Sequence, residues 1–282
     1  MTAIVRNLRF DLETGIPRHW HGGRKSVTSF FDSLSVFFPA GERFFVASVR
    51  AYQNDIKDDA LRQDVRTFCA QEGIHSREHE NYNDRLKGEG YPVAAMEARV
   101  EATLKRLTKN APKELQLAVT CALEHFTALM GHLLLGNPAL LEGAHPEMAA
   151  MWRWHAAEEN EHKCLPYDVY KAVGGSYPVR CAAMIGATAI FWTKVVGHQA
   201  RMMKTDGTVL SAAEWAAVLK FLFIEPGGMF QLIGMYFQYF RPGFHPNDID
   251  STPLLDEWRA DYAQSPVYAH ATPAAAPLAQ SA

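Results

Sequence analysis

The chain of 282 residues carries 28 basic and 31 acidic side chains, a net charge of -3, and 48% of its residues are hydrophobic. This balance is typical of a globular protein, and it lacks the basic excess expected of a protein that binds nucleic acid or an anionic membrane. The four cysteines form no Cys-x-x-Cys pair and the first residues lack the apolar core of a signal peptide, so we expect reduced thiols and a cytoplasmic location.

The spacing of apolar residues predicts helices almost throughout, since no alternating segments joined by hairpin turns occur. A mixed N-terminal segment, 1–37, precedes them. Helices are then predicted over residues 38–56, 58–88, 93–108, 112–136 and 146–175, the last with a kink at Pro166. Four of them have 19 to 31 residues, which is typical of helical bundles. We therefore predict an all-α fold with a bundle over residues 38–175.

Beyond Gly175 the chain becomes strongly apolar and aromatic. The apolar stretches 181–200 and 221–240 are interrupted by charged residues, proline and glycine, which argues against membrane spans. We expect residues 176–264 to form a helical extension packed on the bundle. The alternatives are an apolar cover over a hydrophobic substrate cavity, or a patch that rests on lipid or on a second subunit. The Pro-rich residues 265–282 are predicted to form a disordered tail.

The segment WHAAEENEHK (154–163) places several metal-binding side chain types on one predicted helix. At 100° per residue, His155, Glu159 and His162 share an arc of about 60°. Glu158 lies at the border of this arc. Glu161 points away from it, and we expect that carboxylate to face solvent.

The helix predicted over 58–88 repeats the arrangement, because Glu72, His75 and His79 share one of its faces. The Glu-x-x-His spacing therefore occurs on two long helices. The helices over 38–56 and 112–136 each add one glutamate among apolar neighbours, Glu42 and Glu124. An unpaired carboxylate is costly to bury, so these two glutamates need partners.

Two Glu-x-x-His pairs and two further glutamates form the ligand set of carboxylate-bridged di-iron bundles. Four carboxylates offset the charge of two Fe(II) ions, and one imidazole per metal leaves coordination positions open for oxygen or substrate.

In the order of these residues, with gaps of 30, 49 and 35 positions between the ligand sets, the chain resembles the ferritin-like superfamily, and within it the bacterial family named predicted metal-dependent hydrolases. The resemblance spans about residues 25–240. It implies a ferritin-like four-helix bundle with additional C-terminal helices, and two iron ions (Fe2+/Fe3+) as cofactor, with manganese or a mixed Mn/Fe pair as the alternative. The ligands it implies are Glu42, Glu72, His75, Glu124, Glu159 and His162.

The spacing His155-x-x-x-Glu159-x-x-His162 is similar to that of di-iron arylamine N-oxygenases, in which an extra histidine binds the metal. By this analogy His155 is a seventh ligand. His79 and Glu158 are either ligands themselves or hydrogen-bond partners of ligands.

Some of these residues have plainer explanations. Glu42 lies in a first helical turn, where the helix dipole favours a carboxylate. His155 could serve only to pack against Trp152 or Trp154. A two-histidine zinc protease motif is absent, since Asn83 stands where its second histidine would be, and there is no G-x-S-x-G or phosphate-binding loop.

We expect a non-haem di-iron oxygenase or oxidase that activates O2 to oxidise a small apolar or aromatic molecule. The alternatives are a metal-dependent hydrolase that uses a water activated by two metal ions, and a non-catalytic iron- or metal-binding protein. The expected partners are O2, the small-molecule substrate, an electron donor and a second copy in a homodimer, with no nucleic acid and no membrane contact.

Overall fold

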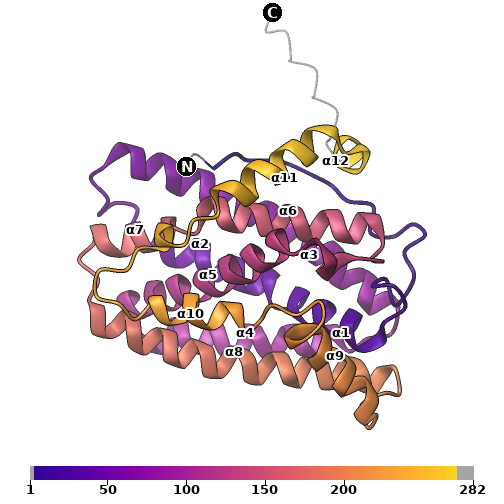
Figure 1. Ribbon diagram of the computed structural model, residues 1–282. Helices are drawn as coiled ribbons and strands as arrows, with labels where there is room; N and C mark the ends of the chain where they lie inside the picture. Colours follow the sequence, from indigo (N-terminus) through magenta and orange to yellow (C-terminus); the bar gives the residue numbers. More distant parts are fainter. Residues whose placement is uncertain (1–2, 272–282) are drawn as a thin grey trace, which may run out of the picture.

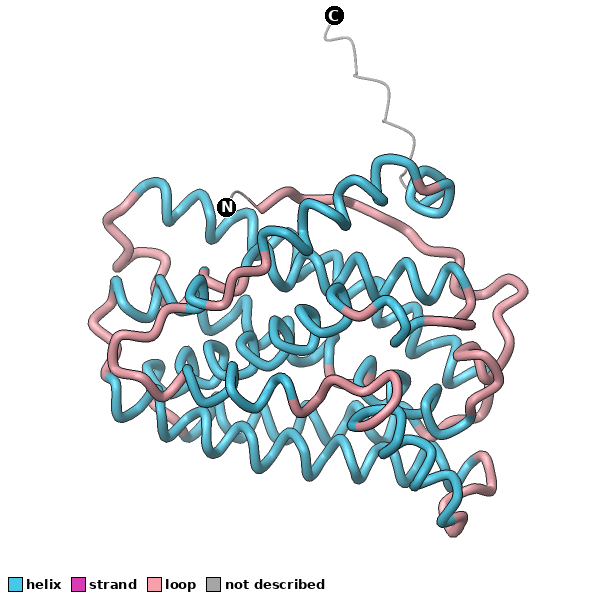
Figure 2. Tube along the Cα trace, in the orientation of Figure 1, coloured by secondary structure: helices cyan, strands magenta, loops and turns pink. Residues whose placement is uncertain are grey.

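The computed structural model describes residues 3–271. Over this range the protein consists of helices joined by loops, with no strand (Figure 2), so the prediction of an all-α fold is confirmed. The helices are α1 (Lys25–Ser35), α2 (Phe38–Arg50), α3 (Asp59–Gly88), α4 (Val93–Asn110), α5 (Lys113–Gly136), α6 (Pro146–His162), α7 (Leu165–Ala172), α8 (Tyr177–Thr205), α9 (Ala212–Phe223), α10 (Gln231–Gln238), α11 (Thr252–Gln264) and α12 (Pro266–Ala271), with two short 3-10 helices, η1 (Pro138–Leu141) and η2 (Pro246–Asp248).

Helices α3, α4 and α5 closely match their predicted ranges, whereas α2 ends early, at Arg50. The helix predicted over 146–175 is interrupted after His162, because Pro166 lacks the N–H that a continuous helix would use there. In the stretch predicted to be disordered, residues 266–271 form α12, and residues 272–282 lie outside the described range. The division into four segments at 37, 175 and 264 stays a prediction.

Four helices enclose the centre of the molecule. Helix α2 packs on α3 and α5, and α6 packs on α5 and α3. Two apolar clusters fill the two ends of this bundle: α3 runs from Phe68 in one cluster to Tyr82 in the other, whereas α6 and α7 run from Trp154 to Leu165 in the opposite sense. The stretch between the clusters carries the polar residues predicted to bind metal.

The remaining helices cover this bundle (Figure 1). Helix α8 runs along the outside against α5 and α1, with α9 on α1 and α10 on α5. The N-terminal segment and α11 lie at the top in this view, and α8 lies at the bottom. By length and composition α5 and α8 resemble membrane spans, which is weak evidence, since 72% of the apolar window of α5 is buried in the bundle. For α8 the buried share is only 28%.

Candidate metal centre

All seven predicted ligands, together with His79, converge between the two apolar clusters. Four overlapping groups of three residues have ligand atoms within 4.8 Å of one another, and every member is buried. The groups are Glu42–His79–His155, His75–His155–Glu159, Glu42–Glu72–His75 and Glu72–Glu124–His162. They share members, so they form one continuous cluster, to which α2, α3, α5 and α6 all contribute. Metal ligation by these residues stays a prediction.

His162 marks one end of the cluster. Its Nε2 lies 3.2 Å from Glu72 Oε1, 3.5 Å from Glu124 Oε2 and 3.6 Å from Glu159 Oε1. Its Nδ1 lies 3.2 Å from the side-chain oxygen of Gln71, which can accept a hydrogen bond from it. Gln71 therefore fixes the ring with Nε2 directed at three carboxylates, the orientation that a metal ligand needs.

His75 is oriented in the same way by a carboxylate. Its Nε2 lies 3.1 Å from Glu158 Oε2, and its Nδ1 faces the cluster, 3.5 Å from Glu159 Oε1. The other oxygen of Glu158 accepts a hydrogen bond from the guanidinium of Arg6 at 3.1 Å. The sequence left open whether Glu158 is a ligand or a hydrogen-bond partner of a ligand. It belongs to none of the four groups, and it orients His75 through the ring nitrogen that faces away from the cluster.

His155 and His79 form a chain of hydrogen bonds at the other end. His155 Nε2 lies 2.9 Å from Glu159 Oε1, and its Nδ1 lies 2.6 Å from His79 Nε2. The remaining nitrogen of His79 meets Ser35 Oγ at 2.9 Å. Both histidines are therefore more than packing residues, and the chain links the cluster to α1.

The cluster lacks hydrogen-bond donors for its oxygens. Neither oxygen of Glu42, Glu72 or Glu124 has a hydrogen-bond partner, and the same holds for Glu159 Oε2, His75 Nδ1 and His162 Nε2. Buried polar atoms nearly always have partners, and buried carboxylates without them are costly. Metal ions would satisfy these atoms, so the mixed carboxylate and imidazole donor set fits the binding of divalent metal ions.

The carboxylates also repel one another. Burial, followed by the charge of Glu72, raises the pKa values of Glu42 and Glu124 well above their usual range. Burial also acts to raise the pKa of Glu159, but the charge of His162 and the hydrogen bond from His155 together help to outweigh it, and the pKa is lowered. Without metal the cluster thus holds protons where cations would sit, and metal binding should release them.

The histidines divide into two kinds. Burial acts to lower the pKa of His75, but its hydrogen bond to Glu158 and the nearby carboxylates of Glu159 and Glu42 outweigh this and raise the pKa to about 10. For His155, burial and the neighbouring charge of His75 lower the pKa to about 4. His155 is therefore neutral at pH 7, as a ligand or proton acceptor must be.

The prediction that Glu161 faces solvent is wrong. This carboxylate is buried and accepts hydrogen bonds from Arg6 at 2.9 Å and from Arg259 at 2.8 Å. The helical wheel correctly directs it away from the cluster, but the N-terminal segment and α11 cover that side of α6. Sequence analysis also missed Arg6 and Gln71, since neither belongs to a recognisable motif.

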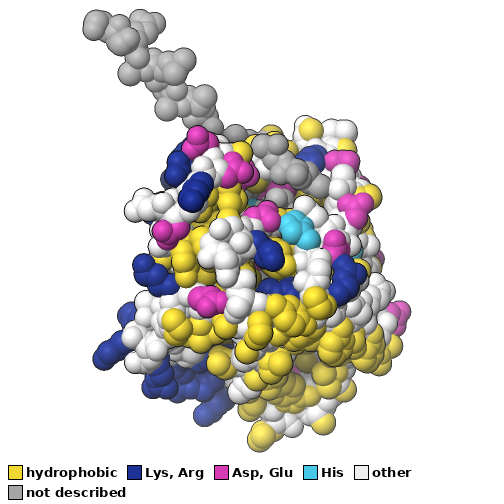
Figure 3. All heavy atoms as spheres, turned by 90° about the vertical axis from the view of Figure 1, so that its left-hand side faces the viewer, with side chains coloured by type: hydrophobic (Ala, Val, Ile, Leu, Met, Phe, Trp, Pro, Cys, Tyr) yellow, Lys and Arg dark blue, Asp and Glu magenta, His cyan; other side chains and the backbone are white. Residues whose placement is uncertain are grey.

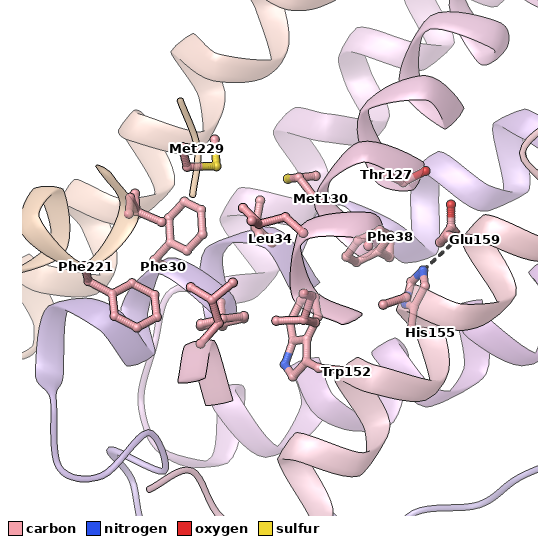
Figure 4. A pocket seen from close by; sticks show the side chains of 17 residues that line it. Phe30, Leu34, Phe38, Thr127, Met130, Trp152, His155, Glu159, Phe221 and Met229 are labelled. Atoms are coloured by element: carbon pink, nitrogen blue, oxygen red, sulfur yellow. Dashed lines mark hydrogen bonds and ion pairs between the residues drawn. The ribbon is translucent and has the colours of Figure 1, made fainter. Parts of the chain in front are cut away.

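An apolar cavity of about 70 Å³ adjoins the cluster. Figure 4 shows His155 and Glu159 at one end of it, joined by their hydrogen bond, with Phe221 and Met229 at the other end. Its remaining walls are almost entirely apolar, with Phe38 and Trp152 near the two polar residues. An apolar molecule could therefore approach the cluster from this side.

Fold and site together define a helical metal-dependent protein with a candidate Glu/His metal centre inside a bundle. The chain belongs to the family described as predicted metal-dependent hydrolases, whose model matches residues 4–250. No curated protein and no solved structure was found to match it.

Proposed function

We propose that this protein binds two divalent metal ions in its interior cluster and is a metal-dependent hydrolase of small, apolar substrates. The observation that carries the proposal is the set of buried carboxylate and imidazole atoms without hydrogen-bond partners, gathered beside an apolar cavity. The family's description supports hydrolysis.

Two of the four groups suggest how a metal pair would be held. Glu72 belongs both to the group with Glu42 and His75 and to the group with Glu124 and His162. Glu72 would therefore contribute to both halves of a site that holds two metal ions. When bound, such a pair lowers the pKa of water toward neutrality to supply a nucleophile, and a redox-active pair would instead exchange electrons with O2.

The residues around the metal ligands have separate roles. Gln71 and Glu158 orient His162 and His75, and the apolar wall with Phe38 and Trp152 excludes bulk water and binds the apolar part of a substrate. The hydrogen-bonded chain from Glu159 through His155 and His79 to Ser35 can carry a proton away from the site.

A second candidate function is the oxidation of the same class of substrate by a di-iron centre of the ferritin-like type. The donor set favours it. Two carboxylates accompany one histidine in each of two groups, Glu42–Glu72–His75 and Glu72–Glu124–His162. These residues lie on the helices of a bundle and not on loops. The ferritin-like assignment, the choice of iron and the role of O2 are part of this second proposal. A cytoplasmic location remains a prediction.

The test begins with metal content and then separates the two reactions. Purified protein loaded with Fe(II), Mn(II) or Zn(II) should retain about two ions per chain, and Glu72→Gln should retain fewer, whereas Glu101→Gln, half-buried on α4 and outside the cluster, should match the native protein. Turnover of apolar esters or amides without O2 would support hydrolysis. Substrate loss that requires O2, with no anaerobic turnover, would contradict hydrolysis and support the second candidate. Failure to retain any metal would contradict both.

A further inference from the structure

The exposed hydrophobic side chains of this protein are concentrated on one face. Among residues 3–271, twelve large hydrophobic residues are exposed, and ten of them lie between Tyr177 and Phe237. They include Phe230 and Phe237, each 62% exposed. Helices α8 and α9 lie at the bottom in Figure 1, and Figure 3, turned about the vertical axis, shows hydrophobic side chains gathered over the lower part of the molecule. We name the surface formed by α8, α9 and α10 the apolar face.

The outer side of α8 is free of charge over four turns. Every exposed residue between Cys181 and Gly197 is apolar or small, and on a helical wheel all of them fall on one side. These residues are Ala182, Ile185, Gly186, Ala189, Ile190, Thr193 and Val196. Helix α8 contains no acidic residue at all. A soluble helix usually places its polar side outward, so α8 is reversed in this respect.

Cations without acidic partners border this strip. Lys194 and Arg201 of α8 lie near Arg99 of α4, and among the described residues none of the three forms an ion pair. Burial and the neighbouring charge of Arg99 lower the pKa values of both Lys194 and Arg201, so these cations repel one another.

We propose that the apolar face docks on the surface of a membrane that contains anionic phospholipids. Apolar and aromatic side chains would enter the boundary between headgroups and acyl chains, and the unpaired cations would meet headgroup phosphates. A second copy of this chain fits less well, because the carboxylates of the face already have partners: Glu225 pairs with Lys220 at 3.0 Å, and Glu214 accepts the backbone N–H of Ser26 at 3.2 Å. The expectation of no membrane contact came from the net charge of the whole chain. A net charge does not show that unpaired cations and apolar side chains are concentrated on one face.

The apolar face also leads toward the candidate metal centre. A cavity of about 570 Å³ lies between α8, α9 and α10, with Ile233 and Phe237 among its lining residues. It shares Phe30, Met130 and Met229 with the small cavity that reaches His155 and Glu159. This route to the metal centre rests on the proposed function: the substrate is then an apolar molecule that enters from the bilayer.

Vesicle binding tests the docking without reference to catalysis. The full chain is incubated with vesicles of phosphatidylcholine alone, or of phosphatidylcholine and phosphatidylglycerol in equal parts, and the bound fraction is measured by flotation. We expect binding to the anionic vesicles, and a loss of about fivefold in affinity for each of Lys194→Gln and Arg201→Gln. Phe230→Ser combined with Phe237→Ser should also weaken binding. Ile4→Ser, which removes a 53% exposed apolar side chain of the N-terminal segment, outside the apolar face, is the matched control.

Each outcome decides the matter once thermal unfolding has shown that the variants fold. Binding that falls in the variants of the apolar face and not in Ile4→Ser supports the proposal. Equal binding to neutral and anionic vesicles, or no binding to either, overturns it. A dimer in solution that is lost in the Phe230 and Phe237 double variant, without vesicle binding, would assign the face to a second copy. Vesicle binding without hydrolysis would refute the function proposal and leave the docking intact.

Discussion

Replacing Glu124 by glutamine should stabilise the metal-free protein and weaken metal binding. Both oxygens of Glu124 are buried without a hydrogen-bond partner, and burial together with the charge of Glu72 raises the pKa of this carboxyl. In the absence of metal the chain must therefore either keep a charge in its interior or take up a proton. A glutamine keeps the shape of the side chain and carries no charge, so it avoids this cost.

The expected size of the two effects follows from the surroundings of Glu124. The buried amide of glutamine also lacks partners, so only the cost of burying a charge or taking up a proton is removed; we expect the metal-free variant to gain about 1 kcal/mol, or roughly 2–4 °C in Tm. His162, 3.5 Å from Glu124, keeps its contact with Glu72 at 3.2 Å and does not lose its charge partner. With metal present the variant has one carboxylate fewer against the same cations. Breaking a buried charge pair costs about 3–5 kcal/mol, which weakens metal affinity at least about a hundredfold.

Thermal unfolding in a chelator, and then at increasing metal concentration, measures both effects on one protein. The native protein should gain stability with metal, and Glu124→Gln should begin higher and gain less. Glu101→Gln, half-buried on α4 and outside the cluster, is the control, and its response to metal should follow that of the native protein. If Glu124→Gln melts lower than the native protein in chelator and binds metal as tightly, Glu124 is a structural residue and the site assignment is refuted.

Three further changes test the packing and charges around the site. A Cβ on Gly131 would lie 2.8 Å from the carbonyl oxygen of Ala156, so Gly131→Ala should push α5 from α6 and cost about 1–3 kcal/mol in chemical unfolding; an unchanged stability would contradict the close contact. Burial raises the pKa of Asp32 to about 7, so folding takes up a proton there and stability falls as the pH rises from about 4 to 7, by about 4 kcal/mol; Asp32→Asn should flatten this slope in unfolding measured across that range, and an identical slope would refute it. Arg6→Met removes one of the two arginine partners of the buried Glu161 and the arginine partner of the buried Glu158, and should cost about 3–5 kcal/mol in chemical unfolding; an unchanged stability would contradict the buried pairing.

Helical periodicity predicted most of what can be read from a single element. The 3.6-residue repeat placed Glu72 and His75 on one face of α3 and Glu159 and His162 on one face of α6, and the two pairs do meet in the interior. The same reasoning predicted the all-α fold, because turn residues and the helical spacing of apolar residues are local properties of the chain. The ends of the helices were predicted less well. Helix α2 ends at Arg50, where the chain turns toward α3, and no residue within α2 signals this turn.

Contacts between distant segments could not be predicted in this way. The sequence described residues 1–37 only as a mixed segment, yet Arg6 reaches α6 and the backbone N–H of Phe10 donates to Glu78. A helical wheel gives the direction of a side chain and says nothing about what covers that direction. For this reason the sequence assigned Glu161 to solvent although it is buried.

The covered side of α6 bears on the candidate metal centre. Its outward glutamates, Glu158 and Glu161, are compensated by the guanidinium of Arg6, whereas Glu159, two residues from Glu161, faces inward to histidines alone. If the interior carboxylates served only stability, arginine could have compensated them in the same way. Instead, the nearby cations are imidazoles. An imidazole can release its proton and bind a metal ion through the same nitrogen, which a site that exchanges protons for metal ions requires.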